Sequence, residues 1–173
     1  MMFIRIILCV FLGGYLMIGD IIFIRTKSPI SWLIRKLTKS KYSHVAILMS
    51  DSGNFLIESD FLKPVKIRKN NYTQFEIVHL NITNEERLKL VSFLVDQTNR
   101  KYDYKRIAGI VLNILGLSDN KNLWNDYNKD ICSELMVRGL TVLHSEGIPK
   151  EIVNAITPAD IANILLKKEM ICK

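Results

Sequence analysis

The chain has 173 residues, of which 49% are hydrophobic and 24% are charged. This length fits one domain, and the composition is that of a globular protein. The net charge of +7 favours anionic partners such as phospholipid headgroups, acidic wall polymers or nucleic acid, although a solvated Lys/Arg surface is the simpler explanation. Cys9, Cys132 and Cys172 are too scattered for a disulfide framework or a zinc site, so we expect no metal and no cofactor.

Residues 1–18 form an apolar leader with targeting character. Arg5 precedes an uncharged run at residues 6–18, which is shorter than the ~20 residues that span a bilayer. No small-x-small cleavage site follows, so a signal peptide, a membrane anchor and a folded N-terminal helix all remain open. We expect a protein that is membrane-associated or exported to the cell envelope, with one domain at residues 19–173.

Strand patterns dominate the first half of that domain. Apolar and β-branched residues predict strands at residues 20–25, 43–49, 54–59, 64–68 and 75–80. Ser28 and Pro29 match the N-cap and first residue of a helix that separates the first two strands. The turn residues Asp51 to Gly53 join the second and third strands into a hairpin.

Helix patterns dominate the second half. A capping box of Thr83 and Glu86 predicts a helix to about residue 98, whose inward side chains would be Leu88, Val91, Leu94 and Val95. Residues 101–104 read as a loop, and further helices are expected at 106–117, at 132–143 and from Pro158 to about residue 168. These elements predict an α+β domain with an antiparallel sheet packed against helices.

Cys132 and His44 are the residues most suggestive of chemistry. Cys132 lies at the expected start of a helix, where the dipole favours a thiolate and the backbone N–H groups can hold an oxyanion. His44 lies on an apolar strand, where it is a polar group at the edge of a core. Each also has an ordinary interpretation, Cys132 as a small buried hydrophobe and His44 as a structural histidine.

Glu58 is the best candidate to orient His44. If Ser50 pairs with Asn54 across the hairpin turn, His44 and Glu58 share one sheet face as diagonal neighbours. A change of one residue in this register would place Glu58 on the other face, as a solvated strand carboxylate.

Five segments of the chain resemble, in order, the circularly permuted papain-like branch of the NlpC/P60 superfamily, close to the YiiX/YaeF-type cysteine hydrolases. They are Gly-Asp-Ile-Ile-Phe at 19–23, Ser-Lys-Tyr-Ser-His-Val-Ala-Ile at 40–47, Ile-Glu at 57–58, Lys-Tyr-Asp at 101–103 and Cys-Ser-Glu-Leu at 132–135. The similarity extends from about residue 19 to about residue 160, and the Ser-His-Val-Ala and Cys-Ser-Glu-Leu pieces are its most specific parts.

The resemblance implies a permuted papain-like α+β fold and a Cys-His-Glu site. Cys132 is similar to the family's nucleophile, His44 to its general base and Glu58 to the residue that orients the histidine. It also implies substrate-binding or oxyanion roles for a second group of residues, namely Tyr42, Ser133, Tyr102 and Tyr104.

The expected function is hydrolysis or acyl transfer at a peptide amide or an acyl-lipid bond, with no organic cofactor. The basic surface and apolar leader favour a substrate near a membrane or the envelope. The alternative is a non-catalytic membrane-surface or binding protein on the same scaffold. We expect no nucleic-acid partner, because that interpretation rests on charge alone and the sequence has no recognised nucleic-acid module.

Overall fold

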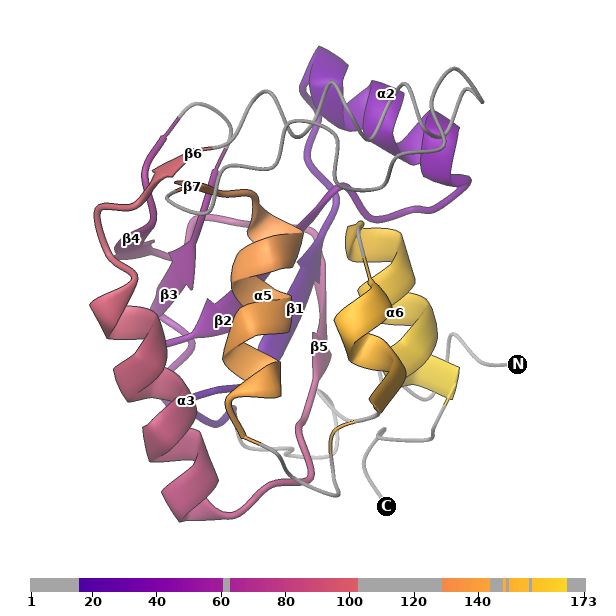
Figure 1. Ribbon diagram of the computed structural model, residues 1–173. Helices are drawn as coiled ribbons and strands as arrows, with labels where there is room; N and C mark the ends of the chain where they lie inside the picture. Colours follow the sequence, from indigo (N-terminus) through magenta and orange to yellow (C-terminus); the bar gives the residue numbers. More distant parts are fainter. Residues whose placement is uncertain are drawn as a thin grey trace.

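The computed structural model describes residues 16–60, 63–102, 129–143, 148, 150–155 and 157–167. In that part of the chain, five antiparallel strands form one sheet in the order β4-β3-β2-β1-β5 (Figure 1). All five predicted strands are present, with ends shifted by one or two residues. They are β1 (Ile21–Ile24), β2 (His44–Leu48), β3 (Phe55–Glu58), β4 (Lys66–Lys69) and β5 (Phe75–Val78).

Helices cover one face of this sheet. Figure 1 shows α3, α5 and α6 side by side in front of the strands, with α2 at one end. Their bounds are α2 (Pro29–Thr38), α3 (Asn84–Asp96), α5 (Cys132–Thr141) and α6 (Pro158–Lys167), and a 3₁₀ helix, η1 (Lys150–Asn154), precedes α6. The predicted α+β class is therefore confirmed.

One predicted loop contains a short strand, and two other predicted segments lie outside the described residues. The predicted loop at 101–104 begins with a short strand, β6 (Lys101–Tyr102), which pairs in parallel with β7 (Lys129–Asp130) immediately before α5. The predicted helix at 106–117 and residues 1–15 of the leader lie outside the described residues. Within the described ranges, no helix is both long and apolar enough to span a bilayer.

Local sequence explains where α2 and α3 begin. The Ser28 hydroxyl accepts a hydrogen bond from the Ser31 N–H at 3.1 Å, and Pro29 occupies the first turn, as predicted. The predicted capping box is also present, because Thr83 Oγ1 accepts from the Glu86 N–H at 3.2 Å and Glu86 accepts from the Thr83 N–H at 2.7 Å.

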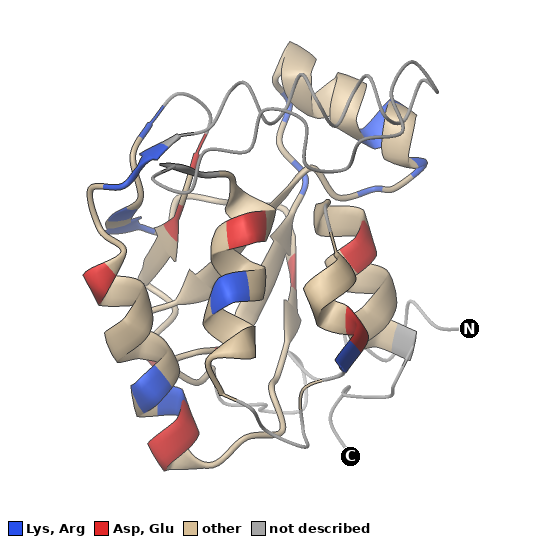
Figure 2. Ribbon diagram, in the orientation of Figure 1, with Lys and Arg blue, Asp and Glu red and all other residues tan. Residues whose placement is uncertain are grey.

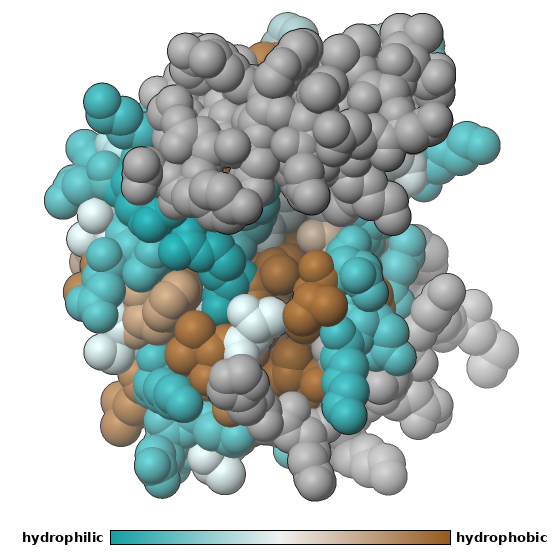
Figure 3. Space-filling model, viewed as in Figure 1, coloured by the Kyte–Doolittle hydropathy of each residue, from teal (hydrophilic) through white to brown (hydrophobic). Residues whose placement is uncertain are grey.

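Apolar residues are buried on both faces of the sheet, which explains why β1, and β2 after His44, are apolar throughout. The larger core lies between the sheet and the helices, and the smaller one lies on the opposite face. Seen from the helical side, hydrophobic residues gather around α5 and between it and α6, with hydrophilic residues to the left and right of them (Figure 3). The smaller core consists of Ile22, Ile24, Ala46, Leu48 and Leu56.

The predicted inward face of α3 is wrong in part. Leu94 is buried as expected, but Leu88 and Val95 are 65% and 41% exposed. The helix instead turns Arg87 inward, where its Nη1 lies 2.9 Å from the Asp20 carboxylate and its Nη2 donates to a backbone carbonyl. A buried ion pair, invisible to an apolar pattern, sets the rotation of this helix.

Candidate active site

The β2–β3 hairpin brings His44 and Glu58 together. Gly53 takes a positive φ of 70° in the turn, and the pairing of Ile47 with Ile57 continues the predicted register. His44 and Glu58 are therefore diagonal neighbours on one face, as predicted. His44 Nε2 lies 2.7 Å from Glu58 Oε2, and both residues are buried.

Cys132 reaches the same site from the helical layer. It is the first residue of α5, which begins directly after β7 and packs against β2. The half-buried thiol interacts with the His44 ring through a hydrogen bond and through charge. Because Nε2 of that ring is already bonded to Glu58, Nδ1 is the nitrogen left for the sulfur. The structure thus brings Cys132, His44 and Glu58 together.

The His44 ring is charged at neutral pH in this setting. Burial alone would lower the pKa of His44, but the charge of Cys132, its hydrogen bond and the Glu58 carboxylate outweigh burial and raise the pKa from 6.5 to about 10. Burial would likewise raise the pKa of Glu58. The hydrogen bond and charge of His44, with smaller effects of Tyr72 and Arg68, instead hold it below its ordinary 4.5. An imidazolium and a carboxylate therefore face each other.

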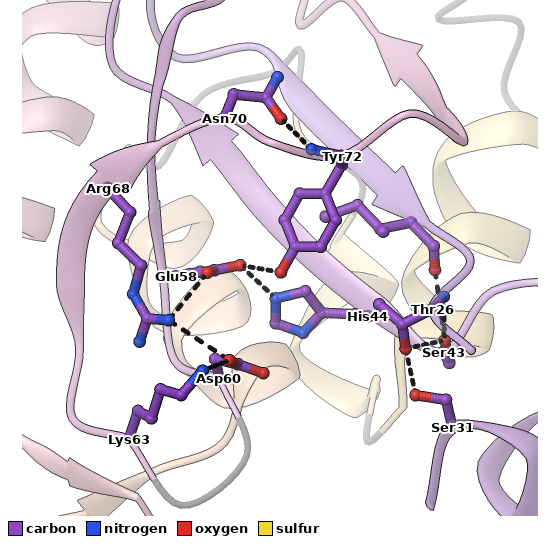
Figure 4. Close-up of polar contacts among 11 residues, drawn as sticks. Thr26, Ser31, Ser43, His44, Glu58, Asp60, Lys63, Arg68, Asn70 and Tyr72 are labelled. Carbon is purple, nitrogen blue, oxygen red and sulfur yellow. Dashed lines mark hydrogen bonds and ion pairs between the residues drawn. The ribbon is translucent and has the colours of Figure 1, made fainter. Parts of the chain in front are cut away.

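Tyr72 and Arg68 complete the surroundings of Glu58, and the sequence did not point to either. The Tyr72 hydroxyl donates to Glu58 Oε2 at 2.8 Å, while Arg68 Nη1 lies 3.5 Å from Oε1 (Figure 4). Arg68 also lies 3.3 Å from the Asp60 carboxylate. Arg68 pairs with Leu56, two residues from Glu58, so the alternation of β3 and β4 could have identified it.

The start of α5 differs from the starts of α2 and α3 in how it is capped. The N-cap residue, Ile131, has no side-chain acceptor, so it cannot cap the first N–H groups of the helix. Glu134 turns back instead and accepts from the Ile131 N–H at 3.3 Å. The backbone N–H groups at the beginning of α5 therefore belong to the same helical turn as Cys132.

Tyr42 and Ser133, two further predicted site residues, are both buried. The buried Tyr42 donates its hydroxyl to Glu76 Oε2 at 2.6 Å, and its ring centroid lies 5.1 Å from that of Phe23. Burial and the Glu76 carboxylate raise the pKa of Tyr42 above its ordinary range. Ser133 is fully buried behind Cys132 in the first turn of α5. The binding or oxyanion roles of Tyr42 and Ser133 stay predictions.

The structure describes less of the other two predicted site residues, Tyr102 and Tyr104. Tyr102 lies in β6, and only its backbone is described; it pairs with Asp130, two residues before Cys132. This pairing places the backbone of Tyr102 close to the start of α5. Tyr104 lies outside the described residues. Their roles stay predictions as well.

Comparison with known proteins gives a fold relationship. No known family model matches the chain, and no curated protein is similar to it in sequence. One solved structure that does match is that of the metalloprotein yiiX from Escherichia coli O157:H7, with a TM-score of 0.55 and 20% identity over 78% of this chain and 68% of that chain. Such low identity shows a shared fold alone. In the described part of the present chain, no three His, Cys, Asp or Glu side chains gather where they could hold a metal ion.

Proposed function

We propose that this protein is a cysteine hydrolase with a circularly permuted papain-like fold, in which Cys132 is the nucleophile, His44 the general acid and base, and Glu58 the residue that orients His44. The observation that carries the proposal is the meeting of these three side chains from α5, β2 and β3. The NlpC/P60-like order of the sequence motifs and the fold shared with yiiX support it.

The geometry suits acyl transfer in two steps. The Cys132 thiolate, whose proton resides on His44, attacks the carbonyl carbon of the substrate, and the backbone N–H groups at the start of α5 hold the oxyanion. His44 then gives its proton to the leaving amine or alcohol, which departs and leaves a thioester. Water attacks this thioester as His44 takes its proton, and the Cys132 thiolate leaves with the carboxylic acid released.

Two substrate classes suit this chemistry. A peptide amide would make the protein an amidase or peptidase, and an acyl-lipid bond would make it a lipid hydrolase. If an alcohol or amine replaces water in the second step, the same site performs acyl transfer. The apolar leader and the net charge of +7 favour a substrate at a membrane or in the cell envelope.

Thiol labelling separates catalysis from a purely binding role. In a variant with Cys9→Ser and Cys172→Ser, iodoacetamide reports Cys132 alone. We expect Cys132 to react faster than free cysteine at pH 7, and His44→Ala to remove that advantage, because the imidazolium stabilises the thiolate. A rate no faster than that of free cysteine would favour a non-catalytic binding protein on the same scaffold.

A substrate panel then tests hydrolysis directly. Wild type and Cys132→Ala are compared on peptide amides and on acyl lipids, with Cys172→Ser as the control for loss of a thiol elsewhere. Hydrolysis that Cys132→Ala abolishes and Cys172→Ser preserves would support the proposal. Hydrolysis that persists in Cys132→Ala would contradict the assignment of the nucleophile.

A further inference from the structure

Helix α2 turns two large apolar side chains to solvent. Trp32 is 55% and Leu33 is 38% exposed, and Ser31 is the one buried residue among the ten of this helix. At 100° per residue, Lys36 projects from the same side as Trp32, and Lys39 follows as the C-cap residue of the helix. The Lys36 ammonium lies 4.9 Å from the Trp32 ring centroid, so cation and aromatic ring form one surface.

The charged residues of the segment that contains α2 have one sign. Residues 21–50 contain six Lys or Arg residues and no Asp or Glu. Figure 2 accordingly shows α2 with basic residues and no acidic ones. Arg35 and Lys41 make contacts within the protein, because Arg35 donates to the Thr26 carbonyl and Lys41 pairs with Glu76. Lys27, Lys36 and Lys39 are exposed, and they lie just before α2, within it and at its C-cap.

The inner side of α2 is attached to the strand that carries His44. Ser31 Oγ and Thr26 Oγ1 form a hydrogen bond, and Thr26 Oγ1 lies 3.2 Å from Ser43 Oγ (Figure 4). Ser43 directly precedes His44 and is buried. Whatever binds the outer side of α2 is thus held at a fixed position relative to the candidate active site.

We propose that α2 docks on an anionic phospholipid bilayer, with Trp32 and Leu33 in the interface and Lys27, Lys36 and Lys39 against the headgroups. An amphipathic helix with Trp and Leu between lysines is suited to lie in the plane of a membrane surface. Each lysine near such a surface strengthens binding roughly fivefold at moderate salt. This docking goes beyond the proposed function and does not require Cys132, so binding can be measured in an inactive protein.

The experiment uses the full chain with Cys132→Ala and with Trp124→Phe, so that tryptophan fluorescence reports Trp32 alone. We expect it to sediment with vesicles of phosphatidylglycerol and phosphatidylcholine, but not with phosphatidylcholine alone. Trp32 emission should shift to the blue and be quenched by brominated acyl chains. Leu33→Ser should weaken binding about tenfold, and Lys36→Glu with Lys39→Glu should weaken it by more than tenfold.

A matched control lies on α3. Leu88 is 65% exposed and precedes the exposed Lys89, so Leu88→Ser with Lys89→Glu removes an apolar residue and reverses a charge elsewhere on the surface. This variant should bind as the parent does. Docking by α2 is ruled out if the control weakens binding as much as the α2 variants, if the α2 variants bind normally, or if Trp32 is not quenched by brominated lipid. Equal binding to vesicles of phosphatidylcholine alone would exclude attraction between the lysines and anionic headgroups.

Discussion

Tyr72 and His44 donate hydrogen bonds to the same oxygen of the Glu58 carboxylate, Oε2, at 2.8 and 2.7 Å. Because an ionised carboxylate only accepts hydrogen bonds, Nε2 of His44 must carry a proton here. The Tyr72 N–H is in turn bonded to Asn70 Oδ1 at 3.1 Å, which fixes the turn that supplies the hydroxyl. Glu58 is held in place from two sides, and it fixes the direction in which the His44 ring points.

Replacing Tyr72 by Phe should shift the acid limb of activity. The Tyr72 hydroxyl is one of the groups that hold the pKa of Glu58 below its ordinary 4.5, so its removal raises that pKa and Glu58 is protonated at a higher pH. We expect kcat/KM to fall roughly tenfold near neutral pH, as for one lost charge-assisted hydrogen bond. A profile of kcat/KM between pH 3 and pH 7 measures both effects. A profile that superimposes on that of wild type would show that Tyr72 does not act through Glu58.

The titration of His44 offers a test that needs no substrate. Cys132 contributes most to raising the pKa of His44 to about 10, against the opposing effect of burial. Cys132→Ala should therefore lower the pKa of His44 well below that of wild type. NMR of labelled histidine, with His44→Gln to assign the signal among three histidines, measures the shift. An unchanged titration would mean that the thiol and the ring do not interact.

Short-range pattern was sufficient to predict the contact between His44 and Glu58. The turn at Asp51 to Gly53 sets the hairpin register, and alternation along β2 and β3 then decides which side chains share a face. Tyr72 lies between β4 and β5, where no alternation indicates its direction. Its contact with Glu58 depends on how the chain returns across the sheet, and that information is absent from a local pattern.

Helix α3 also shows that a local sequence pattern cannot reveal a contact between distant parts of the chain. Its start was predictable because a capping box is a local signal. Its inward face was not, because Arg87 is buried through a contact with Asp20, 67 residues earlier in the chain. A pattern of apolar residues assigns a charged side chain to solvent unless its partner is known.

Glu58→Gln should shift the alkaline limb of activity to lower pH. In the proposed mechanism, His44 must be protonated to give a proton to the leaving group, and its raised pKa extends that state from 6.5 up to about 10. Without the carboxylate this pKa falls, so activity is lost at a lower pH on the alkaline side. We expect kcat/KM at neutral pH to drop roughly 10²–10⁴-fold, the usual contribution of acid–base catalysis.

The matched control for Glu58→Gln is Asp60→Asn. Asp60 is the neighbouring carboxylate, is bonded to Lys63 at 2.7 Å and shares Arg68 with Glu58. We expect its alkaline limb to lie close to that of wild type, because Glu58 is the carboxylate that contacts His44. Profiles measured from pH 6 to pH 11 make the comparison. Equal shifts in both variants would indicate a general effect of negative charge and would contradict a specific orienting role of Glu58.

Arg87→Met should destabilise the fold without changing the site. Asp20 is fully buried, with Arg87 at 2.9 Å from one carboxylate oxygen and His79 at 2.7 Å from the other. Removing Arg87 leaves the buried carboxylate without its guanidinium partner, which lowers the free energy of unfolding by about 3–5 kcal/mol.

Lys89→Met, an exposed change on the same helix, should stay within about 0.5 kcal/mol of wild type in urea unfolding. Because Asp20 precedes β1 and His44 pairs with Ile24 at the other end of that strand, the His44 titration should not move. If Arg87→Met unfolds at the same urea concentration as Lys89→Met, the ion pair does not stabilise the packing of α3.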